Sequence, residues 1–255
     1  ILICLAALPV TTSRMTQPEL PQVPRLALRA LFQAAPAATL GALLGGLTLG
    51  SFWGLAAIFA TRIGLDVTGV ALVVSVTILG GAALQLPIGR LSDRGDRRTA
   101  LVVICLLAAA AAVGTMLPGG QAGLPLYALC FVFGGLTFAI YPLCMAHLLD
   151  HLEPTDTLSA GSSLLLLNGL GSAIGPALAG VAMTRFGAEA LPAFQAAALV
   201  LAALIAGGRR LLRRRDNEHP SEFHVMVQTT PTAIEMLPEV ESPEPESEAG
   251  PGSGS

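Results

Sequence analysis

Long apolar runs separated by short polar connections make up most of the chain. Each run is close to the ~20 residues that a helix needs to cross the hydrocarbon layer of a bilayer. The qualifying runs are residues 36–60, 67–89, 99–117, 124–148, 159–183 and 188–207. Helices suit this role because a strand edge exposed to lipid leaves backbone hydrogen bonds unmade. The pattern therefore predicts an all-α membrane protein with six transmembrane helices, and such short connections predict antiparallel neighbours.

An internal repeat relates the first three predicted helices to the last three. The sequence GGLT occurs at residues 45–48 and again at residues 134–137. At the same spacing, Gly80 corresponds to Gly169. Because a unit with an odd number of spans inverts the unit that follows it, we predict two inverted three-helix repeats. Many secondary transporters are built from such repeats, with the substrate site near the midplane between them.

The two ends of the chain differ from its six-helix body. Residues 1–13 are apolar and begin without methionine or a basic segment, so we predict the end of a transmembrane helix whose beginning is missing, and hence a fragment. Residues 14–34 are predicted to be a cytoplasmic linker and residues 35–207 the six-helix domain. Residues 208–255 are rich in Glu, Pro, Ser and Gly, a composition that predicts a disordered, acidic cytoplasmic tail.

Composition and charge placement favour a membrane protein of defined orientation. Hydrophobic residues make up 53% of the chain and charged residues 12%, whereas soluble domains carry about 25% charged residues. If the connection at 90–98 lies in the cytoplasm, 12 of the 14 arginines lie on that side, as the positive-inside rule requires. We therefore predict a multi-pass protein of the bacterial inner membrane with a cytoplasmic C-terminus.

The connection between the second and third predicted helices is unusually charged. Within QLPIGRLSDRGDRRTALVV, residues 85–103, four arginines alternate with two aspartates. The arginines alone would satisfy the positive-inside rule, but that rule does not account for the interleaved aspartates or the glycine. The pattern indicates a function beyond anchoring the turn.

This connection resembles the signature of the major facilitator superfamily, roughly G-x-L-(A/S)-D-R-x-G-R-(R/K). In that family the signature lies in the cytoplasmic loop between the second and third helices of a six-helix half. The matching residues are Gly89, Leu91, Asp93, Arg94, Arg97 and Arg98. Asp96 stands where the family usually has glycine, a departure that bears on the turn. The resemblance covers about residues 1–207.

The resemblance implies a gate between two six-helix halves. It implies that Gly89 permits close helix packing, and that Asp93 faces the N-terminal end of a helix in the opposite half while it pairs with neighbouring arginines. These contacts would close the cytoplasmic side and break when it opens. The partner implied is the missing N-terminal six-helix half.

Further features favour the C-terminal half of such a transporter. LNGLGSAIGPALAG, residues 167–180, resembles the G-x-x-x-G-P element of the family's fifth or eleventh helix. The expected packing and kink residues are Gly171, Gly175, Pro176 and Gly180. An N-terminal half would carry an arginine in its fourth helix, and residues 124–146 contain none. AIYPLCMAHLLDHLEP, residues 139–154, further resembles uncharacterised bacterial permeases of the superfamily.

The predicted spans contain almost no charge at mid-depth, so a proton-carrying carboxylate is expected in the missing half. His147 is the candidate for proton coupling here, with interfacial packing as the alternative. The candidate pathway residues are Thr48, Ser51, Trp53, Gln85, Thr137, Tyr141 and Asn168. By resemblance, the first and fourth helices line the cavity, which favours five of these: Thr48, Ser51, Trp53, Thr137 and Tyr141. Each serves either a substrate or a neighbouring helix, and the apolar surroundings favour an amphipathic or hydrophobic solute.

The favoured function is secondary active transport of a small solute by alternating access. The alternative is a structural or sensory membrane protein that keeps the fold but transports nothing. An enzyme is not expected, because the spans contain no paired aspartates, no H-E-x-x-H motif and no Ser/His pair. The four cysteines lie in apolar runs without metal-ligand spacing, and we expect no cofactor, no metal and no nucleic-acid partner.

Overall fold

The structure, a computed structural model, describes residues 28–216 apart from 94, 118–119, 121–122 and 153–156. The partial transmembrane helix predicted for residues 1–13 lies outside the described residues. The same holds for residues 217–255, where a disordered tail is predicted.

Every regular element of the described residues is a helix. The helices are α2 (Leu28–Ala34), α3 (Pro36–Arg62), α4 (Val67–Asp93), α5 (Arg97–Gly114), α6 (Gly123–Leu149), α7 (Thr157–Phe186) and α8 (Ala190–Asp216). Helices α3 to α8 each contain a stretch long and apolar enough to cross a membrane, which confirms the six predicted spans. Two boundaries differ from expectation: α2 forms within the predicted linker, and α8 continues beyond its predicted end.

Polar and special residues mark where the helices begin. A proline opens α3, where the missing N–H would have had no partner inside the helix. The Asp66 carboxylate accepts a hydrogen bond from the Gly69 N–H, 2.9 Å away, at the start of α4. Asp96 caps α5, and its carboxylate accepts from the backbone N–H of Arg98 at 3.1 Å. These signals are local, so the sequence predicts the helix starts within a few residues.

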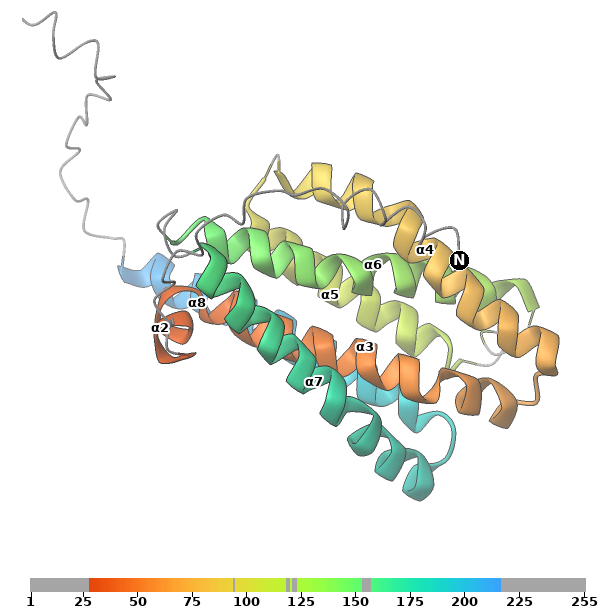
Figure 1. Cartoon of the computed structure of the whole chain (residues 1–255). Helices are drawn as coiled ribbons and strands as arrows, with labels where there is room; N and C mark the ends of the chain where they lie inside the picture. Colours follow the sequence, from red (N-terminus) through yellow and green to blue (C-terminus); the bar gives the residue numbers. More distant parts are fainter. Residues whose placement is uncertain (1–27, 94, 118–119, 121–122, 153–156, 217–255) are drawn as a thin grey trace, which may run out of the picture. The chain divides into compact units, whose positions relative to one another are not determined.

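The two repeats pack against each other through their first and second helices. The first helix of each repeat packs along the second helix of the other, so that α3 lies against α7 and α6 against α4 (Figure 1). Both pairs meet at glycines where a Cβ would overlap a carbonyl oxygen of the facing helix: that of Asn168 for Gly46, and that of Thr77 for Gly134. The arrangement is the one expected of two inverted three-helix repeats.

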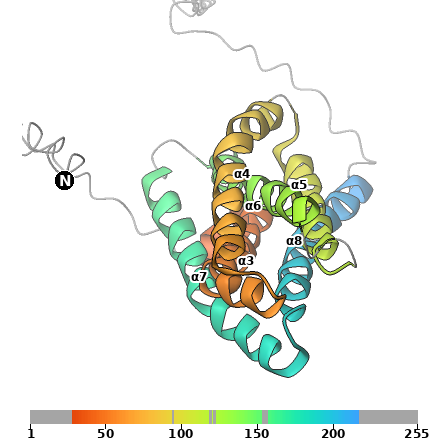
Figure 2. The same cartoon turned by 90° about the vertical axis from the view of Figure 1, so that its right-hand side faces the viewer.

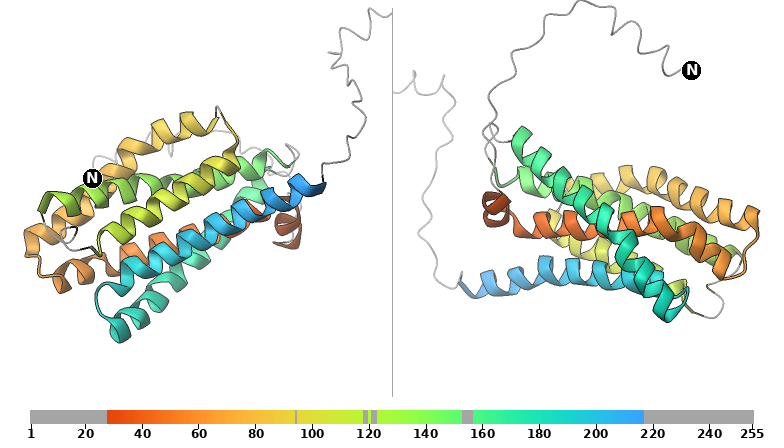
Figure 3. Two further views of the ribbon diagram at one scale, coloured as in Figure 1. Left: turned by 180° about the vertical axis from the view of Figure 1, so that it is seen from behind. Right: turned by 60° about the horizontal axis from the view of Figure 1, so that its bottom comes forward.

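Helices α3 and α6 occupy the middle of the bundle. Figure 2 shows α4 and α7 on one side of them and α5 and α8 on the other. In the left panel of Figure 3, which shows the molecule from behind, α5 and α8 are nearest the viewer. The larger apolar core lies between α3, α6, α5 and α8, and includes Phe52, Leu101, Phe133 and Leu199. The 90–98 connection is called the knot below for its cluster of charges, not for any threading of the chain, and the end of the bundle that carries it is called the knot end.

Candidate gating site at the ends of helices α4, α5, α6 and α8

Asp96, the residue at which the 90–98 connection departs from the family pattern, caps helix α5. Its carboxylate accepts hydrogen bonds from the Arg98 backbone N–H at 3.1 Å and from the Thr99 hydroxyl at 2.6 Å. A negative charge at a helix N-terminus also offsets the unfavourable position of Arg97 and Arg98 in the first turn of α5. The aspartate therefore begins the helix where the family uses glycine.

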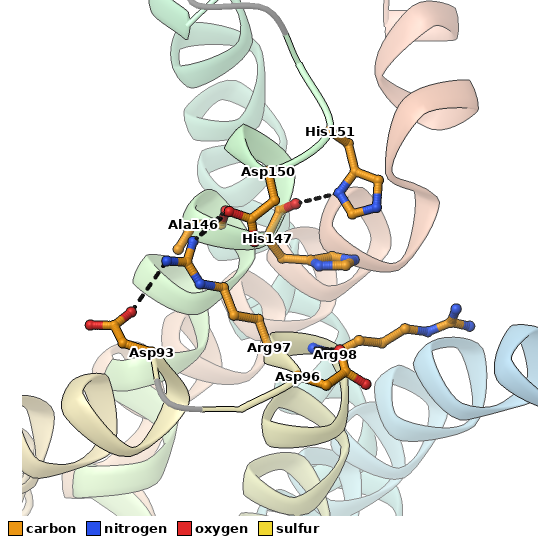
Figure 4. A network of polar contacts seen from close by, with 8 residues as sticks. All are labelled: Asp93, Asp96, Arg97, Arg98, Ala146, His147, Asp150 and His151. Carbon is orange, nitrogen blue, oxygen red and sulfur yellow. Dashed lines mark hydrogen bonds and ion pairs between the residues drawn. The ribbon is translucent and has the colours of Figure 1, made fainter. Parts of the chain in front are cut away.

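Arg97 joins three helix ends. One guanidinium nitrogen donates to the Ala146 carbonyl at 2.8 Å and to the Asp150 carboxylate at 3.1 Å, at the end of α6. The other nitrogen donates to the Asp93 carboxylate, 3.3 Å away, at the end of α4 (Figure 4). The Arg97 guanidinium thus points away from the positive N-terminal end of α5 and lies at the negative C-terminal end of α6, where the helix dipole favours a cation.

The network around Arg97 is partly open to its surroundings. The Arg97 side chain is 27% exposed, whereas Asp93 is 65% exposed and Asp150 48%. Ion pairs this exposed contribute about 0.2–1 kcal/mol each. Such an arrangement holds helix ends together with contacts that a modest conformational change can break.

Arg98 extends the knot to the last helix. Its Nε donates a hydrogen bond to the carbonyl of Ala206 in α8, and Figure 4 shows its side chain reaching toward that helix. Neighbouring arginines therefore bind different helices, Arg97 the end of α6 and Arg98 the body of α8. The resemblance to the family predicted gating residues here, but it did not indicate these partners within the same half.

His147 lies beside the network rather than in the middle of the span. It is buried in the last turn of α6, and its ring meets that of His151 edge to face, with centroids 4.8 Å apart. The His151 Nδ1–H donates to the His147 carbonyl at 2.9 Å. In the described part of the chain no three His, Cys, Asp or Glu side chains gather as a metal site would require.

The last turn of α4 is largely exposed, although Arg97 binds it through Asp93. Leu91 is 74% exposed, and a Cβ at Gly89 would meet nothing within 4 Å among the described residues. Only Ser92 is buried in the last turn of α4, so the motif's glycine, leucine and aspartate remain available to a partner. Arg94 lies outside the described residues.

Three predicted pathway residues face the inside of the bundle. Thr48, Ser51 and Thr137 are all buried, and each hydroxyl donates to a carbonyl of its own helix, at 2.9, 2.7 and 2.8 Å respectively. Ser51 also accepts a hydrogen bond from the Gln195 amide of α8 at 3.3 Å. Gln195 was missed, although a glutamine inside an apolar span was the signal that could have found it.

The other four pathway candidates are placed differently. The Asn168 amide donates to the Ala42 carbonyl at 3.0 Å and so joins α7 to α3. Trp53 and Gln85 are exposed, and Tyr141 is half-buried. The structure therefore does not gather all seven candidates into one site.

The glycine-rich stretch of α7 lies along α3. A Cβ at Gly171 or Gly175 would overlap the carbonyl oxygen of Leu43 or Leu47, respectively. Helix α7 continues through Pro176, whose ring lies where a Cβ of Gly54 would point. Gly180, by contrast, faces open space.

Comparison with known proteins agrees with this architecture. The sequence model of the Major Facilitator Superfamily matches residues 38–239. An uncharacterised MFS-type transporter of Enterobacter sp. (strain 638) is 26% identical over 181 residues, which cover 71% of this chain and 44% of that protein. The uncharacterised MFS-type transporter YcaD is 28% identical in Escherichia coli and 27% in Shigella flexneri, over 57% of this chain and 37% of each relative. The chain thus spans less than half the length of these curated relatives.

Proposed function

Because the chain belongs to the major facilitator superfamily, a family of membrane transporters rather than enzymes, we propose that it forms six helices of a secondary transporter. The transporter would move a small solute across the bacterial inner membrane by alternating access, with two six-helix halves rocking about a central site. Since the relatives are more than twice as long as the matched part, the second half would lie in the remainder of a longer chain.

We assign this chain to the C-terminal half, with the knot end in the cytoplasm. The lack of arginine in residues 124–146 and the glycine-rich stretch of α7 support the assignment to that half. The sequence count supports the orientation, because alternating spans would put 12 of the 14 arginines on the side of the 90–98 connection.

The observation that carries the proposal is the position of Arg97. Its guanidinium links the ends of α4 and α6 to the start of α5, while Asp93 stays 65% exposed beside it. We propose that this network holds the cytoplasmic end of the half in one shape and presents Asp93 to the opposite half when the gate is closed. When the gate opens, Asp93 would lose its contact with the opposite half and be hydrated instead. Arg97 would keep the ends of α4 and α6 bound to the start of α5 in both states.

The strength of these contacts suits a gate. A transporter must populate both open and closed states, so the net free-energy difference between them cannot exceed a few kcal/mol. Exposed ion pairs of about 0.2–1 kcal/mol each meet this requirement.

The test is solute flux by the full-length protein in proteoliposomes with an imposed proton or sodium gradient, across a broad solute panel. We expect gradient-dependent flux of at least one solute. Arg97→Ala and Asp93→Asn should each lower it by about tenfold or more. Asp93→Asn weakens the contact with the opposite half, and Arg97→Ala releases the helix ends that present Asp93. Expression and thermal stability in detergent should change little.

Arg185→Ala is the matched control, because this exposed arginine lies at the opposite end of the bundle. Wild-type flux in Asp93→Asn and Arg97→Ala would remove the network from the mechanism. No gradient-dependent flux across the panel would favour the alternative, a membrane protein that keeps the fold in a structural or sensory role.

A further inference from the structure

Trp53 occupies an unusual place for a tryptophan in a membrane helix. It lies well inside α3, away from both ends, and is 53% exposed. Tryptophans of membrane proteins concentrate at the two interfaces, where the ring nitrogen meets water and headgroups. A half-exposed indole within a span therefore needs another explanation.

Two aromatic contacts hold the Trp53 ring in place. Phe138 of α6 meets it edge to face, with centroids 6.2 Å apart and an angle of 70°. Phe52 meets it in the same way at 5.6 Å and 71°. Phe138 is in turn braced by α4, because a Cβ added at Gly81 would overlap the phenyl ring. Edge-to-face pairs are favourable geometries for aromatic rings, so these rings form a preorganised surface.

Phe52 also contacts a second aromatic ring, which is buried. Phe52 and Phe133 lie 6.2 Å apart, and both are buried in the core shared with α5 and α8. Trp53 and Phe138 are not part of that core. Phe52 thus connects the buried Phe133 ring to the Trp53–Phe138 pair, and that pair is the more open part of the row.

Polar groups beside the open pair distinguish it from a lipid-facing surface. Tyr141 follows Phe138 by about one helical turn and is half-buried, with part of its ring packed against the apolar core. Gln85 follows Gly81 by one turn in α4 and is exposed. An amide left without partners in hydrocarbon costs several kcal/mol. The relatives' extra length supplies chain to cover this face, so it is expected to border protein or a cavity rather than lipid tails.

We propose that Trp53, Phe138, Tyr141 and Gln85 form an aromatic subsite for a neutral, planar aromatic solute. The Trp53 and Phe138 rings stack against the solute, while the Gln85 amide and the Tyr141 hydroxyl supply hydrogen bonds at its edge. None of these four side chains is charged, and because aromatic rings can also bind cations, the neutral class is tested below against a cation. The inference rests on the proposed transport function and names its class of substrate; Phe138 was not among the residues predicted from the sequence.

Trp53 is the only tryptophan of this chain, so its emission reports on the subsite once any tryptophan in the remainder of the longer protein is replaced by phenylalanine. The full-length protein in lipid nanodiscs is titrated with the neutral probe N-phenylnaphthylamine, which accepts energy from excited tryptophan. We expect saturable quenching of the Trp53 emission, above the linear quenching of a protein-free lipid control with added tryptophan octyl ester. Phe138→Ala should raise the probe's Kd about 3- to 10-fold through loss of the ring.

Phe138→Tyr keeps a ring and should bind within about twofold of wild type. Phe186→Ala is the matched control, since this phenylalanine is 82% exposed at the far end of α7. Circular dichroism and thermal melting check that each variant folds. Quenching that never saturates, or an unchanged Kd in a folded Phe138→Ala, would overturn the proposal. Displacement of the probe by the cation tetraphenylphosphonium with equal affinity would overturn its neutral class.

The binding assay and the flux assay separate the two proposals. Saturable binding without flux of any solute would leave the subsite standing and contradict transport. Gradient-driven flux that Phe138→Ala does not change, with no saturable probe binding, would leave transport standing and contradict the subsite.

Discussion

At the scale of single residues, neighbouring side chains of the 90–98 connection divide two tasks between them. Asp96 begins α5 through its bonds to the Arg98 N–H and the Thr99 hydroxyl, and its charge makes two first-turn arginines tolerable. The arginine side chains then leave α5 and bind α6 and α8. The motif is therefore both a helix start and a link between helices.

Substitution of Asp96 tests how much its cap stabilises helix α5. Asp96→Ala removes the cap and should lower stability by about 1 kcal/mol, whereas Asp96→Gly should cost only a few tenths, since glycine is tolerated at this position. Asp96→Asn keeps an accepting oxygen and serves as the control. Thermal melting in detergent measures the order Asn, Gly, Ala. Equal melting temperatures for Ala and Asn would show that the cap does not stabilise α5.

The position of His147 permits a direct test of proton coupling. If His147 carries the coupled proton, His147→Gln in the full-length protein should abolish uptake driven by a pH gradient. Solute exchange without a gradient should persist at about the wild-type rate, because exchange needs no net proton movement. His151→Gln is the control, since this ring lies after the last turn of α6. Equal loss of both activities in His147→Gln would indicate a packing role.

At the scale of helices, glycines decide which pairs approach closely. Helix α3 meets α7, and α4 meets α6, at positions where any side chain would overlap a backbone carbonyl of the facing helix. Lipid provides no hydrophobic drive between helices, so close backbone packing of this kind is a main source of their association.

Gly46→Ala tests the contact between α3 and α7. The added methyl would overlap the Asn168 carbonyl, so the helices must separate, at a cost of about 1–3 kcal/mol. The melting temperature should fall by roughly 2–4 °C for each kcal/mol. Gly180→Ala faces open space and should melt at the wild-type temperature or above it. An equal fall in both variants would mean that helix packing is not what the glycine provides.

At the scale of the whole molecule, the arginine distribution predicts its orientation in the membrane. In intact cells, Gly95→Cys in the knot should react with a membrane-permeant maleimide but not with an impermeant one. Val67→Cys, at the exposed start of α4 on the opposite end, should react with both. Cys4, which lies outside the described residues, is replaced by serine in both variants, and the background should be low because Cys105, Cys130 and Cys144 are buried. Labelling of Gly95→Cys from outside would reverse the proposed orientation.

The sequence by itself determined the type and approximate bounds of the six membrane helices within the described residues, and the family. Hydrophobic length, capping aspartates and the 90–98 motif are local along the chain, so each can be interpreted without knowing what lies beside it. The same is true of the glycine stretch of α7, because glycines at helical spacing indicate close packing before the partner is known.

Only the tertiary structure decided which way the polar side chains face. The hydroxyls of Thr48, Ser51 and Thr137 donate hydrogen bonds to carbonyls of their own helices, and these side chains are buried, whereas Trp53 is exposed. From the sequence, all four were equal candidates for the pathway. The partners of Arg97 at the end of α6 also come from distant parts of the chain. The physical reason is that a helix carries side chains on all sides, and only the crossing of its neighbours determines which side is buried.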